Sequence, residues 1–228
     1  MDGLGLVLLV PLLFAVAFVV AVTLTAVSRA RGRRRRGAAL LAWGGDRGWA
    51  LVPGDPAARQ VPCPPMEAGG SAHLVARGPA PDGAPTLVVE WSRWVHISGG
   101  GDVGSSSQRE IRSVVAVSPL PGPPRGTGGS AEIVPFSAAG GRRAQRRARD
   151  RAVATGHRGF DERYLLRADG SAAVPPALVA WLGELPRVPD LGLRVTGGHL
   201  VCWGPGRLTV PRLEDLLGFS CAVRAHGR

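Results

Sequence analysis

The clearest pattern along the chain is an uninterrupted apolar run over residues 4–27, which ends where a dense series of arginines begins. As a helix, these 24 residues span about 36 Å, enough to cross a hydrocarbon core of about 30 Å with some tilt. A helix satisfies its own backbone hydrogen bonds in lipid, and the hydroxyls of Thr23 and Thr25 can bond to carbonyl oxygens of the preceding turn. We therefore assign residues 1–28 to a transmembrane anchor.

The charges on either side of this run predict its orientation. Asp2 is the charged side chain before it, and residues 29–37 form a basic juxtamembrane segment after it with six arginines: Arg29, Arg31, Arg33, Arg34, Arg35 and Arg36. Basic residues stay on the cytoplasmic side. A cleaved signal peptide shows the opposite order of charge. We expect a single-pass protein of the cell membrane, with the N-terminus outside and the C-terminal domain in the cytoplasm.

Residues 38–136 form the first α+β portion. It begins with a short helix that has Leu40, Leu41 and Trp43 on its apolar side and ends at Gly44-Gly45. Trp43 and Trp49 fit either the membrane interface or, as we prefer, the domain core. Residues 53–71, rich in proline and glycine, predict a surface connection.

Short apolar and β-branched runs then predict strands at residues 73–77, 86–97, 113–117 and 132–136, with a loop at 119–130. Trp91 and Trp94 are three residues apart, so they should point to opposite faces of their strand. One should fill the core, and the other should cover an edge or meet a helix.

Residues 157–228 form the second α+β portion, and its pattern is the most regular. Residues 160–169 predict a strand with Phe160, Glu162, Tyr164 and Leu166 on one side. A short helix begins at the prolines 175–176, and two strands flank the turn at residues 196–198. The closing helix should bury three leucines: Leu213, Leu216 and Leu217. The fold class is therefore α+β: an N-terminal transmembrane helix, then a cytoplasmic domain of short, mostly antiparallel strands with a few helices.

The net charge of +11 is concentrated in two places. One is the juxtamembrane segment. The other is residues 137–156, an Arg-rich connector or helix that includes Arg142, Arg143, Arg146, Arg147 and Arg151. A helix and a disordered connector are both open for this segment. Outside the two clusters, basic and acidic residues balance. Basic patches beside a membrane span attract anionic lipid headgroups, so we predict that both clusters contact lipid.

Nucleic acid is disfavoured as a partner. No aromatic residue is interleaved with the second arginine cluster, and no recognised reading motif surrounds it.

Motifs for cofactors and metals are weak. Gly99, Gly101 and Gly104 spell GxGxxG, but a strand rather than a helix should follow, which favours a hairpin loop. A phosphate loop of the Walker type needs a lysine, and the chain has none. We therefore predict no cofactor.

Two histidines and two cysteines resemble a zinc ligand set in spacing: His199, Cys202, Cys221 and His226. His199 and Cys202 are three residues apart on a predicted strand, so their side chains point to opposite faces. Cys221 and His226 are five residues apart on a predicted helix, so their side chains point in different directions around its axis. We predict no metal site and expect the two cysteines to be small buried hydrophobes. With Cys63 they make an odd number of thiols, and in a cytoplasmic domain we expect no structural disulfide.

Catalytic patterns are equally sparse. There is no GxSxG, and Asp161 and Glu162 are neighbours on a predicted strand, where they would face apart. Glu214 and Asp215 are expected on the solvated face of the last helix. We therefore assign no catalytic residue.

Four segments resemble a group of uncharacterised single-pass membrane proteins that is common in GC-rich actinobacteria. They are RRRRGAALLAWGGDRGWALVPGDP, SVVAVSPLPGPP, TGHRGFDERYLLRAD and GGHLVCWGPGRLTVPRLEDLL. The resemblance implies the same order of span, arginine run and cytoplasmic α+β domain. It carries no functional residue. The SGGGDVGSSS loop and the dense arginines before His157 depart from the group's pattern.

These observations predict a membrane-anchored domain that binds or scaffolds a protein partner, not identified by the sequence, at the inner membrane surface. The alternative is an enzyme that acts on a membrane-proximal substrate through a site that the sequence does not show.

Overall fold

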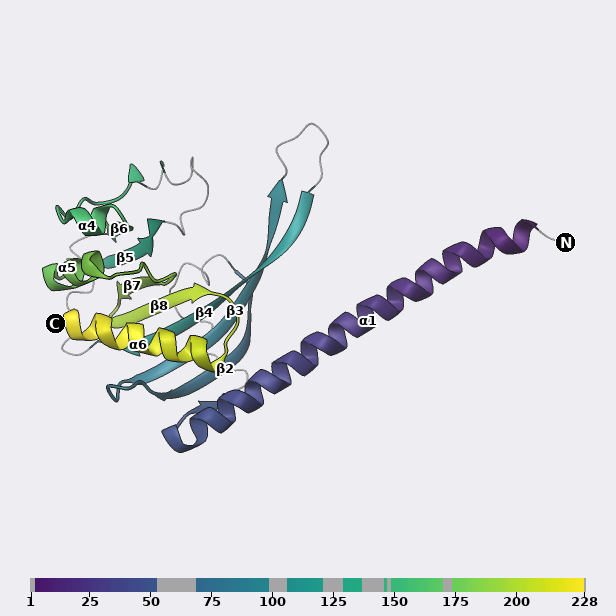
Figure 1. Cartoon of the computed structure of the whole chain (residues 1–228), viewed down its shortest axis with the longest axis horizontal. Coiled ribbons are helices and arrows are strands. Elements are labelled where there is room, and N and C mark those ends of the chain that lie inside the picture. The colour runs from purple at the N-terminus through teal and green to yellow at the C-terminus, as the bar shows by residue number, and fades with distance from the viewer. Residues whose placement is uncertain are drawn as a thin grey trace.

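The computed structural model describes residues 3–52, 69–98, 106–120, 129–136, 146, 149–169 and 174–227. A long N-terminal helix is followed by an antiparallel sheet with a few helices packed on it (Figure 1). This is the α+β fold that the sequence predicts.

Helix α1 runs without interruption from Gly3 to Gly44. The span, the arginine run and the short helix expected after it are therefore one element. No proline lies between Pro11 and the end of the helix, and most of residues 28–43 are good helix formers such as Ala, Leu and Arg. The hydroxyls of Thr23 and Thr25 donate to the carbonyl oxygens of Val19 and Val22, as expected. The helix ends at Gly44, and a 3-10 turn, η1 (Gly45–Arg47), leads to β1 (Ala50–Leu51).

The described strands form one eight-stranded sheet in the order β1-β2-β3-β4-β8-β7-β5-β6, and every neighbouring pair is antiparallel. The strands after β1 are β2 (Ser71–Pro79), β3 (Pro85–Ser98), β4 (Ser106–Pro119), β5 (Ser130–Pro135), β6 (Tyr164–Asp169), β7 (Gly192–Thr196) and β8 (His199–Pro205). The helices after α1 are α4 (Arg158–Asp161), α5 (Pro176–Glu184) and α6 (Val210–His226).

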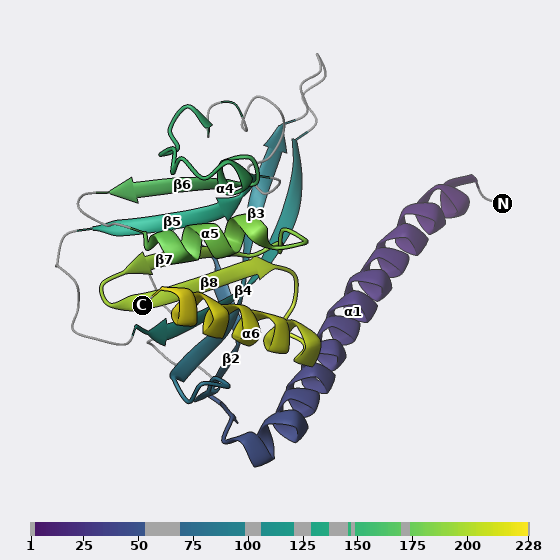
Figure 2. The same ribbon diagram turned by 60° about the vertical axis from the view of Figure 1, so that its left-hand side comes forward.

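The two faces of the sheet carry separate apolar clusters. α5 and α6 lie on one face (Figure 2), where leucines of both helices pack with alternate residues of the strands, among them Val88 and Val114. The next residues along, Val89 and Val115, point to the other face and pack with Trp91. The register of β3 with β4 is unbroken from Leu87 to Ser98, so Trp91 and Trp94 lie on opposite faces as predicted. Trp91 is 7% exposed in the core, whereas Trp94, at 58%, is largely exposed.

One strand prediction is wrong at its start. Residues 160–163 do not continue β6; Phe160 and Asp161 belong to α4. The Asp161 carboxylate accepts hydrogen bonds from the backbone N–H groups of Thr155 and Gly156, and the imidazole of His157 accepts one from the backbone N–H of Phe160. These caps favour a helical turn over an extended chain.

The predicted alternation along β6 fails for a second reason. Tyr164, Leu165 and Leu166 are all buried, so this part of the strand has no solvent-facing side. Asp161 and Glu162 lie at a helix end instead of facing apart on a strand.

The other predicted elements are confirmed where the structure describes them. Strands occur at the four predicted places in the first portion, and α5 begins at Pro176. β7 and β8 are joined by Gly197 and Gly198, whose φ angles of 55° and 76° suit a tight hairpin turn. α6 buries the three predicted leucines. Most of the predicted connection at 53–71 and of the loop at 119–130 lies outside the described residues.

Candidate functional site

The C-terminal turns of α1 are part of the domain core. Leu40 is 4% exposed and Trp49, just beyond the helix, is 7% exposed, while Trp43 is half-buried against the same cluster. The rings of Trp43 and Trp49 lie 5.9 Å apart between centroids. Both tryptophans therefore belong to the domain core, as preferred from the sequence.

A buried ion pair joins α1 to β3, the third strand in the order of the sheet. Glu90 on β3 is fully buried, and its carboxylate accepts hydrogen bonds from Nη2 of Arg36 at 3.3 and 3.5 Å and from the backbone N–H of Leu208 at 2.9 Å. The side chain of Arg36 is 15% exposed. A buried carboxylate is costly unless it is paired and hydrogen-bonded. Arg36 therefore holds the helix at a definite place against the sheet.

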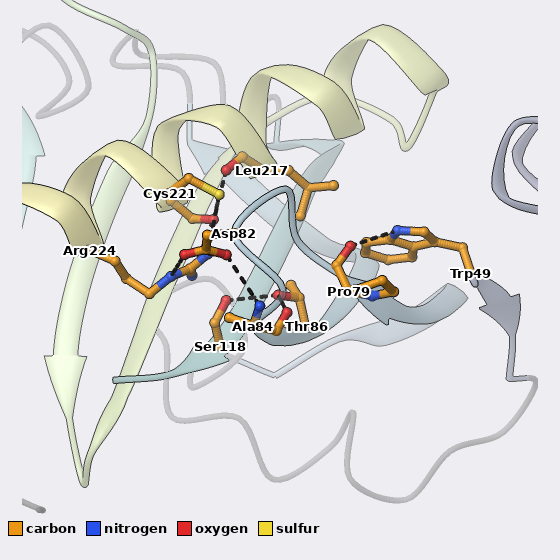
Figure 3. Close-up of polar contacts among 10 residues, drawn as sticks. Trp49, Pro79, Asp82, Ala84, Thr86, Ser118, Leu217, Cys221 and Arg224 are labelled. Carbon is orange, nitrogen blue, oxygen red and sulfur yellow. Dashed lines mark hydrogen bonds and ion pairs between the residues drawn. The ribbon is translucent and has the colours of Figure 1, made fainter. Parts of the chain in front are cut away.

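Two tryptophan side chains add polar contacts to this junction. Nε1 of Trp43 donates to Oε1 of Glu214 on α6 at 2.8 Å, so Glu214 is tied to α1 instead of being only solvated. Nε1 of Trp49 donates to the carbonyl oxygen of Pro79 at 3.0 Å (Figure 3). The ring of Trp49 lies directly against Gly78, where a β-carbon would collide with it. Together these contacts connect α1 to β2, β3 and α6.

The arginines predicted to contact lipid have different environments. Arg36 is turned into the domain, whereas the other five of its cluster are exposed along α1: Arg29, Arg31, Arg33, Arg34 and Arg35. In the second cluster Arg146 and Arg151 are exposed, and Arg142, Arg143 and Arg147 lie outside the described residues.

The structure does not bring the two clusters together. The backbone N–H of Val153, just after the second cluster, donates to the carbonyl oxygen of Leu166 on β6. β6 is an edge strand, and five strand spacings separate it from β3, which Arg36 meets. At about 4.8 Å each, these spacings amount to roughly 24 Å.

A second ion pair locks the β2–β3 turn to α6 (Figure 3). Nε and Nη2 of Arg224, a residue only 3% exposed, each donate to a carboxylate oxygen of Asp82 at 2.7 Å. The hydrogen bonds from Arg224 lower the pKa of Asp82 to about 2. The two hydrogen bonds of this bidentate ion pair fix the orientation of the carboxylate relative to the guanidinium. The pair therefore holds the β2–β3 turn at a fixed position under α6.

The two cysteines and two histidines whose spacing resembles a zinc ligand set lie in different environments. Cys202 is fully buried, and burial raises the pKa of its thiol to about 12. Cys221 is half-buried beside Arg224, and burial raises the pKa of its thiol too. His199 is at the β7–β8 turn, and His226 stacks on Trp181 at the end of α6. Within the described ranges, no group of three or more potential ligands is placed to hold a metal ion.

A shallow pocket at the junction has an apolar lining. It is formed by α1, β1 and their neighbours: Leu40, Leu41, Trp43, Trp49, Ala50, Leu51, Ala76 and Leu213. Such a surface offers no acid, base or nucleophile. The glycines of the GxGxxG pattern lie outside the described residues.

Sequence reasoning missed the ion pair of the junction, Arg36 with Glu90. The sequence pattern does contain one indication of Glu90's role. In the run 86–97 Glu90 lies on the same strand face as Val88, so a charged side chain occupies a position that is expected to be buried. Its partner Arg36, 54 residues away, carried no such signal because it is one of a row of arginines.

Comparison of the chain with models of protein families, with curated proteins and with solved structures gives no match. The resemblance to the actinobacterial group therefore stays a hypothesis.

Proposed function

We propose that this chain is a single-pass membrane protein whose domain, on the cytoplasmic side, is a non-catalytic binding or scaffold module. The observation that carries the proposal is the continuity of α1, which passes from the apolar run through the exposed arginines into the domain core, where Arg36 meets Glu90. A domain fixed in this way to its anchor presents its surfaces at a set height and angle to the membrane.

The described part of the apolar run supports the membrane anchor. α1 contains one stretch that is long and apolar enough to cross a membrane. Its side chains project away from the domain: Phe18 is 70% exposed and Leu24 is 64% exposed. In water such a surface is unfavourable, whereas lipid covers it. The five exposed arginines then lie at the headgroup level, where each contributes about 1 kcal/mol with anionic lipid.

The environment of the buried carboxylates favours a structural over a catalytic role. Glu90 is held by Arg36, and Glu132 on β5 lies between Arg167 and Arg194, with nitrogen–oxygen distances of 3.3 and 2.7 Å. Both carboxylates are therefore engaged by arginines of the domain or of α1. No observation on the described residues favours the enzyme alternative.

Photo-cross-linking of the full chain in its native membrane tests the proposal. A photoreactive residue is placed, one at a time, at the exposed positions Asp215 on α6, Arg187 after α5 and Arg207 after β8. A scaffold should give at least one discrete, light-dependent protein adduct. The same residue at Leu24, in the apolar run, is the matched control and should label lipid. Absence of a protein adduct at all three domain positions, with lipid labelling at Leu24, would contradict the scaffold role and leave the anchor intact.

A further inference from the structure

The contacts at the junction show how β3 is aligned with α1. Arg36 of α1 contacts Glu90 on β3. Nearer the C-terminus of α1, Leu40 lines the same pocket as Ala76 of β2, which pairs with Val88 of β3. The contacts of α1 thus move toward the start of β3 as the helix approaches its C-terminus. The two elements are therefore antiparallel, and β3 beyond Glu90 extends toward the N-terminal half of α1. In Figures 1 and 2 the outer parts of β3 and β4 and the N-terminal half of α1 both extend upward in the view, and they diverge from each other.

Trp94 lies on this extension at the level where the apolar run ends. From Arg36 back to Val27 there are nine helical residues, a rise of about 14 Å at about 1.5 Å each. From Glu90 to Trp94 there are four residues of strand, a rise of about 13 Å at about 3.3 Å each. The even separation also places Trp94 on the same strand face as Glu90, the face that meets α1.

The exposure of Trp94 has no explanation within the domain. At 58% it is more exposed than any other large apolar side chain described outside the apolar run, the next being Leu41 at 50%. An indole ring has an apolar body with one N–H donor, and this combination favours the headgroup region of a bilayer. A position level with Val27 is in that region when α1 spans the membrane.

We propose that the outer part of β3 is a second membrane contact, in which Trp94 lies among the lipid headgroups. This inference rests on the proposed function, because it takes α1 as the membrane span. With two contacts, the helix and the outer part of β3, the domain cannot rotate freely about α1. The face of the sheet that carries α5 and α6 then keeps one direction relative to the membrane.

Tryptophan quenching by brominated lipid tests this contact in the full chain. The protein is reconstituted in phosphatidylcholine–phosphatidylglycerol vesicles, with or without bromine near the headgroup end of the acyl chains. The emission difference between the unchanged chain and Trp94→Phe isolates Trp94. A matched variant, Trp181→Phe, isolates an indole on α5 that stacks on His226. We expect brominated lipid to remove most of the Trp94 signal and none of the Trp181 signal.

Flotation of the same vesicles separates the two proposals. If the chain floats with the vesicles at high salt while the Trp94 signal is unquenched, the contact of β3 is wrong and the anchor stands. An unquenched but blue-shifted Trp94 signal would mean that a protein surface, such as a second copy, covers the ring, and it too would overturn the lipid contact. A chain that does not float would overturn the anchor and the contact of β3 together.

Discussion

The two buried carboxylates described in the sheet, Glu90 and Glu132, are both held by arginines. With no lysine in the chain, each buried ion pair uses a guanidinium, which spreads its charge and donates from several nitrogens. The sequence places Glu90 and Val88 on one strand face, but it does not reveal which of the many arginines pairs with a given carboxylate. Which arginine forms an ion pair with a buried carboxylate depends on contacts between residues far apart in the chain. In a row of arginines, no local feature distinguishes the one that is paired.

Asp82→Asn should destabilise the domain in a way that depends on pH. The change leaves the buried guanidinium of Arg224 without a charged partner, and a loss of about 2 kcal/mol in unfolding free energy is expected near neutral pH. The folded-state pKa of Asp82 lies below the ordinary value of 3.8, at about 2. The stabilisation is therefore fully present above about pH 4 and is lost as the pH falls toward 2.

Denaturant titration of the full chain in detergent, at a series of pH values, measures this effect. The difference between the unchanged chain and Asp82→Asn should be constant above pH 4 and should shrink below it. Glu162→Gln is the control, because Glu162 and Arg158 form an exposed pair whose loss should not change stability measurably. A difference for Asp82→Asn that stays constant down to pH 2 would contradict the ion pair.

Most elements follow from local patterns, and the exceptions have local causes. Apolar periodicity, the prolines before α5 and the paired glycines before β8 predict helices and strands that the structure confirms. The strand predicted from Phe160 is wrong because caps from Asp161 and His157 favour a helical turn. The sequence pattern does not predict that α1 continues across the arginine run, because the apolar pattern ends there, although no proline interrupts the run.

Gly78→Ala tests whether the packing of Trp49 holds α1 to the sheet. A β-carbon at Gly78 meets the ring of Trp49, so the ring must shift and the junction should lose about 1–3 kcal/mol of stability. Denaturant titration and a red shift of tryptophan emission measure the change. Gly45→Ala is the matched control, because a β-carbon there meets nothing within 4 Å. Equal stability of the two variants would show that Trp49 does not hold the junction.

The order of strands brings distant parts of the chain into one sheet. β8, from the second portion of the chain, pairs with β4 from the first, and β5 from the first lies between β6 and β7 from the second. Sequence patterns identify strands but do not state their neighbours, because strand pairing depends on contacts across long loops. For the same reason they could not show that the second arginine cluster precedes the edge strand farthest from α1.

This arrangement of the whole molecule gives the membrane-facing parts distinct roles. In the proposed function, α1 and its five exposed arginines are the anchor, and contacts of Arg36, Trp43 and Trp49 join α1 to the domain. Contact of the second arginine cluster with lipid stays a prediction. Arg36 of the first cluster meets β3, whereas Val153, just after the second cluster, bonds to β6 at the edge of the sheet.

The measurement that tests the central claim most directly is the accessibility of the domain to trypsin in sealed, right-side-out membrane vesicles. We predict that the domain stays intact until the vesicles are permeabilised. Replacing the five exposed arginines of α1 by Gln, with Arg36 kept for Glu90, should expose the domain in a fraction of molecules. Five exposed domain arginines replaced in the same way should leave the orientation unchanged: Arg146, Arg151, Arg158, Arg187 and Arg207. Digestion of the unchanged chain in intact vesicles would contradict a cytoplasmic domain carried by α1.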